Sequence, residues 1–246
     1  MTATAQRLRS APGPAERVVA LDWARIGAAL DEEGHALIPG FLTRAECDAL
    51  AALYSSEERF RSKIVMVRHG FGEGEYKYFA YALPEIVATL RTALYPPLVA
   101  VANRWNAALR VAARYPEEHA DYLARCHRAG QTRPTPLLLK YAAGDYNRLH
   151  QDLYGGEFFP LQATVLLSAP ERDFTGGEFV LVEQRPRMQS RATVVPLRQG
   201  DAVIFAVHYR PVRGARGSYR ANLRHGVSRL TSGNRMTLGI IFHDAK

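Results

Sequence analysis

Cysteine is scarce in this chain of 246 residues, which contains only Cys47 and Cys126. Two cysteines so far apart exclude the disulfide framework of a small secreted domain, and we interpret them as reduced core thiols of a cytoplasmic protein. Long apolar runs are also missing, since none reaches the roughly 18 residues of a membrane-spanning helix. The polar residues 1–14 lack the apolar stretch of a secretory signal, so we expect a mobile tail there.

Acidic residues and lysine are almost absent from residues 184–235. Asp201 is the only acid of this segment, and its basic residues are eleven arginines. The segment therefore carries a net charge of +10, whereas the whole chain carries +8. Arginine makes forked contacts with phosphate and stacks on bases, which favours a polyanionic partner, DNA or RNA. The alternative interpretation is a solvated surface held by salt bridges to the rest of the chain.

Internal repeats and low-complexity tracts are absent too, which argues against a solenoid. A hydrophobic content of 47% with 10% aromatic residues supports a substantial core. The pattern changes near Gly130, from helical periodicity to short β-rich runs. We therefore expect a helical support region over 15–130 and a β core over 131–246, integrated in one α+β domain. The sequence does not indicate an oligomeric state.

The first region carries several helix signals. Residues 22–30 fit a short helix and residues 36–41 an extended piece. Thr43 and Glu46 form a capping-box pattern ahead of a helix to about residue 54. Pro84 suits the first turn of a further helix. The pair Pro96-Pro97 is expected to interrupt the pattern before a long amphipathic stretch to about residue 127.

The second region alternates short β-rich runs with glycine-containing turns. Many short strands at near-regular spacing predict a sandwich or barrel. The runs are 137–141, 163–167, 178–182, 192–195, 202–205 and 235–242.

A candidate metal site lies in this β region. His150 and Asp152 are two residues apart, so both side chains point to the same face of an extended segment. His225, in a second β-like stretch, is the candidate third ligand. Two imidazoles and one carboxylate on one face leave coordination positions open, which suits Fe(II).

Further motifs accompany this His-x-Asp pair in a fixed order: Lys140-Tyr141, Gly144-Asp145-Tyr146, the turn 175–179 (Thr-Gly-Gly-Glu-Phe) and the strand 200–205 (Gly-Asp-Ala-Val-Ile-Phe). Together they resemble the core of bacterial, prolyl-hydroxylase-like Fe(II)- and 2-oxoglutarate-dependent oxygenases. The resemblance covers about 137–243. It implies a double-stranded β-helix, or jelly roll, that uses Fe(II), 2-oxoglutarate and O₂ to hydroxylate a substrate C–H bond, with release of succinate and CO₂.

The resemblance also suggests how 2-oxoglutarate is held. Arg235 lies ten residues after His225, where the family places a basic residue on the distal carboxylate of the cosubstrate. A guanidinium fork matches a carboxylate, and Thr237 shares its strand face two residues on. Tyr141 is the candidate for a further hydrogen bond.

The substrate remains open between two classes, of which we favour nucleic acid, dealkylated oxidatively as in DNA repair. Candidate phosphate contacts are Arg210, Arg213, Arg216, Arg220 and Arg224. An extruded base would need apolar or aromatic walls, for which the candidates are Tyr76, Tyr78, Phe79, Tyr146 and Tyr154. AlkB-type dealkylases, however, carry a second arginine six residues after the cosubstrate arginine, and here that position is Ile241.

The alternative is hydroxylation of a protein side chain of the prolyl type, with the arginines binding an acidic peptide or forming a solvated surface. A binding-only jelly roll is a third, non-enzymatic reading. Residues 71–79 mix glycines with aromatic residues and form either a lid over the substrate or an ordinary loop leading into a strand.

Overall fold

The computed structural model describes residues 12–153 and 155–246. Its α-helices are α1 (Pro14–Val19), α2 (Trp23–Glu33), α3 (Arg44–Ala52), α4 (Glu85–Ala108) and α5 (His119–Arg128). Short 3₁₀ turns are η1 (Leu53–Ser55), η2 (Glu57–Arg59) and η3 (Met66–His69). The strands are β1 (His35–Ile38), β2 (Phe60–Val65), β3 (Gly72–Glu73), β4 (Glu75–Phe79), β5 (Leu137–Ala142), β6 (Tyr146–His150), β7 (Leu161–Leu166), β8 (Phe174–Gly176), β9 (Phe179–Gln184), β10 (Arg191–Val195), β11 (Ala202–Ala206), β12 (Tyr209–Gly214), β13 (Gly217–Val227) and β14 (Leu230–Ile240).

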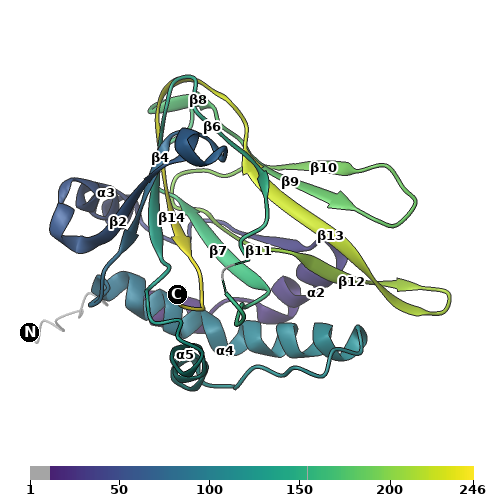
Figure 1. Cartoon of the computed structure of the whole chain (residues 1–246). Coiled ribbons are helices and arrows are strands. Elements are labelled where there is room, and N and C mark those ends of the chain that lie inside the picture. Colours follow the sequence, from purple (N-terminus) through teal and green to yellow (C-terminus); the bar gives the residue numbers. More distant parts are fainter. Residues whose placement is uncertain (1–11, 154) are drawn as a thin grey trace, which may run out of the picture.

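These strands form two antiparallel sheets that face each other (Figure 1). The larger sheet has the order β1-β11-β7-β14-β5-β4-β2, with β8 paired to β14. The smaller sheet has the order β10-β9-β13-β6-β3, with β12 paired to β13. This is the predicted jelly roll, and each of the six predicted runs of 131–246 overlaps one of its strands.

The central strands β7 and β11 of the larger sheet are buried on both faces, which explains their largely apolar sequences. In β11, Ile204 packs against the helices while Val203 and Phe205 face the smaller sheet. The smaller sheet has one exposed face, so β13 alternates between exposed and buried residues from Arg220 to His225. The interior between the sheets is therefore the protected place for a site.

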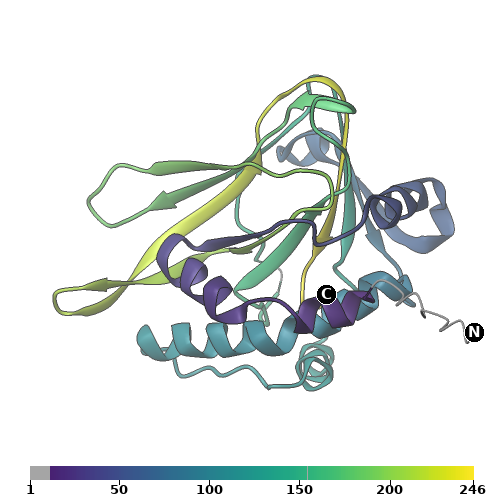
Figure 2. The same ribbon diagram turned by 180° about the vertical axis from the view of Figure 1, so that it is seen from behind.

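Helix α4 covers the outer face of the larger sheet, with α2 beside it (Figure 2). Contrary to expectation, α4 runs through Pro96-Pro97 without a break. Leu90, Leu94 and Leu98 are all fully buried, and packing of this apolar stripe outweighs the backbone hydrogen bonds that proline removes. By length and composition alone α4 could cross a membrane, but half of its apolar window is buried inside the protein.

The predicted division near residue 130 needs correction. The region 15–130 contains helices, but it also supplies four strands to the two sheets. β1 pairs with β11, β4 with β5, and β3 with β6. The aromatic segment 71–79, predicted as a lid or as a loop leading into a strand, contains the short β3 and the strand β4. Strand pairing is non-local, so the sequence of this region alone did not reveal it.

Two predictions from the local sequence of the region 15–130 are confirmed. Thr43 caps α3, and the Glu46 carboxylate accepts from the Thr43 backbone N–H at 2.8 Å, which completes the predicted capping box. Cys47 and Cys126 are free and buried, in agreement with the predicted core thiols. A cytoplasmic location stays a prediction. Of the predicted tail, residues 1–11 lie outside the described part, and α1 begins at Pro14.

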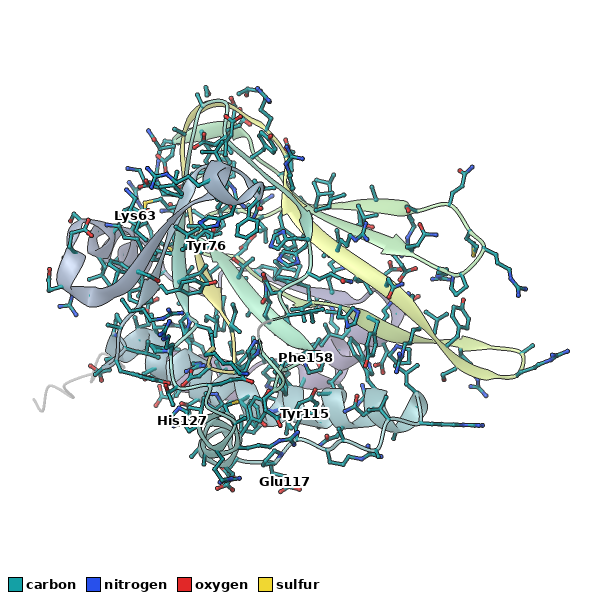
Figure 3. All side chains as sticks on the ribbon, viewed as in Figure 1. Lys63, Tyr76, Tyr115, Glu117, His127 and Phe158 are labelled. Carbon is teal, nitrogen blue, oxygen red and sulfur yellow. The ribbon has the colours of Figure 1, made fainter. Side chains whose placement is uncertain are left out.

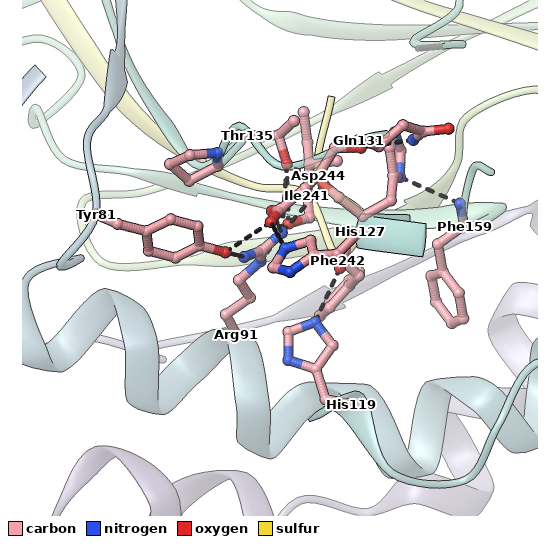
Figure 4. A network of polar contacts seen from close by, with 12 residues as sticks. Tyr81, Arg91, His119, His127, Gln131, Thr135, Phe159, Ile241, Phe242 and Asp244 are labelled. Atoms are coloured by element: carbon pink, nitrogen blue, oxygen red, sulfur yellow. Dashed lines mark hydrogen bonds and ion pairs between the residues drawn. The ribbon is translucent and has the colours of Figure 1, made fainter. Parts of the chain in front are cut away.

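A buried polar network joins α4 to the C-terminal residues (Figure 4). Arg91, which is 2% exposed, pairs with the fully buried Asp244 at 2.8 Å. The Arg91 guanidinium also donates to the carbonyl oxygens of Ile241 and His243. Asp244 accepts from Tyr81 Oη, at 2.8 Å. Arg91 Nη1 donates to Tyr81 Oη at 3.1 Å, so every nitrogen of the guanidinium has an acceptor, and the network anchors the end of the chain beneath the larger sheet.

Candidate metal centre

His150, Asp152 and His225 meet inside the smaller sheet, as the sequence predicts. His150 ends β6 and stands directly opposite His225 on β13, with ring centroids 4.2 Å apart. Asp152 follows two residues later. Its Oδ1 lies 3.5 Å from His150 Nε2 and its Oδ2 lies 3.3 Å from His225 Nε2. One ligand atom from each residue lies within 4.8 Å of the others, close enough to surround one metal ion.

The two imidazoles of the cluster differ in their surroundings. His150 Nδ1 donates to the carbonyl oxygen of Arg148 at 2.7 Å, so the lone pair of Nε2 faces Asp152. His225 is 6% exposed, and burial, followed by the charge of His150, lowers its pKa. The neutral imidazole that results is the form that binds metals.

Gln162 on β7 is a member of the cluster that the sequence did not reveal. Its side chain is 7% exposed, and its Nε2 donates to Asp152 Oδ2 at 2.8 Å. The same nitrogen lies 3.4 Å from His225 Nε2. A glutamine within an apolar strand run carries no motif, so only the three-dimensional fold brings it to the site.

Arg235 on β14 is buried near the cluster, but part of its guanidinium lacks hydrogen-bond partners among the described residues. It is 1% exposed, yet its Nε and Nη1 have no hydrogen-bond partner among the described residues. Burial lowers the pKa of its guanidinium to about 10, which still leaves a cation at neutral pH. A buried cation with open donors is costly unless an anion binds it. Arg235 therefore fits an acidic ligand such as a carboxylate.

Tyr141 and Thr237 flank this guanidinium. Tyr141 is the register partner of Arg235 on the neighbouring strand β5, and its ring lies 5.7 Å from Arg235 Cζ. Tyr141 Oη accepts a long hydrogen bond, 3.4 Å, from Asn147 Nδ2. Burial raises the pKa of Tyr141 to about 12, so the phenol stays protonated and can donate. Thr237 lines the pocket two residues after Arg235, as predicted.

One continuous pocket between the sheets joins the metal ligands to Arg235. Of the predicted aromatic walls, Tyr76 lines it and points between the sheets (Figure 3), whereas Tyr78, Phe79 and Tyr146 do not line it. Tyr154 lies outside the described residues. The lining residues are Phe71, Tyr76, Leu137, Leu139, Tyr141, Asn147, His150, Gln151, Asp152, Gln162, Thr164, Phe179, Phe205, His225, Gly226, Val227, Arg235, Thr237, Gly239 and Ile241.

The predicted arginine contacts divide into two kinds. Arg210 is 2% exposed, and its guanidinium pairs with Glu183 at 2.7 Å and donates to the Asp31 carbonyl oxygen. It is a structural residue that joins β12, β9 and α2, and the expectation of a phosphate contact was wrong for it. The other four, all exposed, lie on the hairpin of β12 and β13: Arg213, Arg216, Arg220 and Arg224.

Strand alternation fixes where two of these exposed arginines point. Arg224 precedes the inward-facing His225, so Arg224 and Arg220 lie on the outer face of the smaller sheet. The Arg220 guanidinium packs over the Tyr209 ring at 4.7 Å on that face. Figure 3 shows nitrogen-tipped side chains projecting from the free ends of the hairpins. These arginines therefore cannot touch a group bound at the metal cluster, although they can contact a larger partner.

Comparison with known proteins now decides the class. Residues 74–245 match the family described as "Oxygenase, catalysing oxidative methylation of damaged DNA". The chain belongs to this oxygenase family. Two uncharacterized proteins of Mycobacterium tuberculosis, from strains H37Rv and CDC 1551, are each 52% identical to the oxygenase over 167 residues, which cover 68% of this chain and 72% of the relative.

Solved structures agree with the fold of the oxygenase. An oxidoreductase of the 2OG-Fe(II) oxygenase family from Burkholderia pseudomallei superposes with a TM-score of 0.55 at 14% identity, covering 92% of this chain and 94% of that one. A prolyl 4-hydroxylase of Phytophthora capsici gives a TM-score of 0.56 at 16% identity, covering 95% and 66%. Family, fold and the His-Asp-His cluster together identify a 2-oxoglutarate- and Fe(II)-dependent oxygenase, an oxidoreductase whose class uses Fe(II), 2-oxoglutarate and O₂.

Proposed function

We propose that the cluster of His150, Asp152 and His225 binds the Fe(II) and that Arg235 binds the distal carboxylate of 2-oxoglutarate. The open nitrogens of Arg235 carry the second assignment, because a carboxylate satisfies them with forked, charge-assisted hydrogen bonds. Thr237 is a further donor beside it. When bound, Fe(II), 2-oxoglutarate and O₂ supply the oxidant that turns a substrate C–H into C–OH as 2-oxoglutarate becomes succinate and CO₂.

We propose further that the substrate is a damaged base in nucleic acid, hydroxylated on an N-alkyl carbon. The N–CH₂OH product then breaks at the C–N bond, which returns the proton to nitrogen and releases an aldehyde. The family description, which names damaged DNA, supports this class. A base must leave its stack to reach a buried metal, so residues at the mouth of the pocket would contact the extruded base.

The pocket mouth carries a planar apolar surface suited to a base. Phe71 lines the pocket but is 47% exposed, and its ring stacks on His69 with centroids 5.3 Å apart. Gly72 allows this placement, because a Cβ there would lie 2.3 Å from the carbonyl oxygen of Tyr146 on β6. Stacking of a base on an aromatic ring contributes about 1–3 kcal/mol without regard to sequence. The half-exposed Phe71 ring is the observation that carries the substrate proposal.

Arg148 is an exposed cation whose backbone is bonded to that of Phe71. Its backbone N–H donates to the carbonyl oxygen of Phe71 at 2.8 Å, and its carbonyl accepts from His150. An arginine fixed between a mouth residue and a metal ligand can hold the phosphate that flanks the bound base. The outer-face residues Arg220 and Arg224 would contact more distant phosphates.

The test is succinate and aldehyde release with Fe(II) and 2-oxoglutarate, comparing an N-methylated oligonucleotide, its unmodified twin and a proline-containing peptide. We expect aldehyde from the methylated oligonucleotide alone. Phe71→Ala should raise the KM for that oligonucleotide by roughly 5- to 150-fold, from the stacking energy, while Phe158→Ala, on a separate loop, serves as control. Hydroxylated peptide with no aldehyde from the oligonucleotide would identify a protein hydroxylase instead.

A further inference from the structure

The Asp152 carboxylate needs an external contact to present one oxygen to the metal. The last torsion of an aspartate is broad, so the two oxygens exchange places easily in an unrestrained side chain. Here Oδ1 lies on the His150 side and Oδ2 on the His225 side. Which oxygen is available to a metal therefore depends on what holds the carboxylate.

Gln162 makes such a contact from the opposite sheet. It lies on β7, in register with Phe205 of β11, and its side chain enters the pocket between the sheets. An ionised carboxylate only accepts, so the Gln162 atom 2.8 Å from Asp152 Oδ2 must be the donating Nε2. Gln162 Oε1, at the other end of the amide, is buried with no partner among the described residues. The hydrogen bond to Asp152 thus sets the orientation of the amide.

We infer that Gln162 is a positioning residue that fixes the rotation of the Asp152 carboxylate through its hydrogen bond to Oδ2. The inference rests on the proposed metal site. Groups of this kind, one step removed from the metal, typically change metal affinity or activity by about 10- to 100-fold. The same Nε2 lies within hydrogen-bond distance, 3.4 Å, of His225 Nε2, so the amide contacts two members of the metal cluster at once.

Gln162→Met tests the inference, because it keeps the length of the side chain and removes the donor. The readout is Mn(II) affinity measured by electron paramagnetic resonance on metal-free protein, which does not depend on substrate or turnover. We expect the Kd for Mn(II) to rise about 10- to 100-fold. The visible absorption of the Co(II)-loaded variant should also change in shape, because the carboxylate is free to bind through either or both oxygens.

Thr164→Val is the matched control. Thr164 is two residues further along β7, lines the same pocket, and donates to the Leu238 carbonyl oxygen rather than to Asp152. Its loss removes one buried hydrogen bond from the same strand face, and Mn(II) affinity should stay within about 2-fold of wild type. Equal losses of Mn(II) affinity in both variants would mean general damage to the strand and would overturn the inference.

Two further outcomes separate this inference from the proposed function. If wild-type protein binds Mn(II) and Gln162→Met binds it equally well with an unchanged Co(II) spectrum, Gln162 has no positioning role while the metal site stands. If wild-type protein binds neither Mn(II) nor Co(II), the metal site itself is rejected, and the role of Gln162 is rejected with it.

Discussion

Two buried arginines, Arg91 and Arg235, occupy opposite sides of the larger sheet and differ in what surrounds them. Arg91 has a buried carboxylate and two carbonyl oxygens as acceptors. Arg235 is equally buried but has two nitrogens without a partner among the described residues. A buried cation that is satisfied within the fold stabilises it, whereas one left open awaits a ligand. Completeness of the hydrogen bonding therefore separates a structural centre from a functional one.

The largest effect is expected at the metal cluster, in the same pocket as Arg235. Asp152→Ala removes the carboxylate of the metal cluster, and we expect Fe(II)-dependent succinate release to fall by more than about 100-fold, beyond the range typical of residues one step removed from a metal. The circular dichroism spectrum should stay that of wild type, because the cluster serves a ligand. Retention of wild-type turnover would exclude Asp152 as a ligand.

Substitution in the Arg91 network should instead change the stability of the fold. Arg91→Met strands the buried Asp244 without its ion pair, and we expect the free energy of unfolding to drop by about 3–5 kcal/mol. Urea denaturation measures it, and the double variant Arg91→Met/Asp244→Leu should recover part of the loss. A change below about 1 kcal/mol for Arg91→Met would show that the network contributes little.

Arg235→Met reverses this pattern. It removes an unsatisfied cation, so the free energy of unfolding of the ligand-free protein should be unchanged or higher. The affinity for 2-oxoglutarate, titrated calorimetrically with Mn(II) bound, should fall by the energy of one charged hydrogen bond or more, about 1.5–3 kcal/mol or roughly 10- to 150-fold. Arg235→Lys should lie between the two, because an ammonium lacks the fork. A stability loss like that of Arg91→Met would contradict the comparison.

The smallest effect concerns the pH dependence of stability and two histidines beside the Arg91 network. Burial lowers the pKa of both His119 and His243 to about 4, whereas the unfolded value is near 6.5. Between these values the unfolded chain binds more protons, so stability is complete above about pH 6.5 and is lost as the pH falls toward 4.

Acidification from pH 6.5 to 5 should therefore cost roughly 1.5 kcal/mol for each histidine. Urea midpoints across this range measure the slope. His119→Gln retains a donor for the Phe242 carbonyl oxygen, which accepts from the imidazole at 2.8 Å, and should reduce the pH dependence. An unchanged slope in that variant would assign the acid sensitivity elsewhere.

The site was predictable where the chemistry lies in local spacing. His150 and Asp152 share one face of an extended segment, Arg235 was assigned by the family resemblance, and strand alternation then placed Thr237 beside it. Gln162 was missed because its role depends on which strand of the opposite sheet faces Asp152. Arg210 was misassigned because charge alone does not reveal a buried partner such as Glu183.

The fold shows the same limit. The β-rich second half was recognisable from its runs and glycine turns, and the jelly roll followed from the motif order. In the first half, the extended piece 36–41 anticipated β1 and the segment 71–79 anticipated β4. The strand β2 was not predicted, and neither was the pairing of β1 with β11 or of β4 with β5, because these pairs span a large sequence separation. In α4, the burial of neighbours such as Leu94 and Leu98 outweighs the tendency of Pro96-Pro97 to break a helix.

Three of the four N-terminal strands, β1, β3 and β4, cover the open edges of β11, β6 and β5. A fragment that started at residue 131 would keep every proposed metal and cosubstrate ligand but expose three rows of unpaired backbone donors and acceptors. Exposed edges of this kind recruit strands from other molecules. Such a truncated protein should therefore self-associate and aggregate, so expression of the complete jelly roll is needed to obtain soluble material for the assays above.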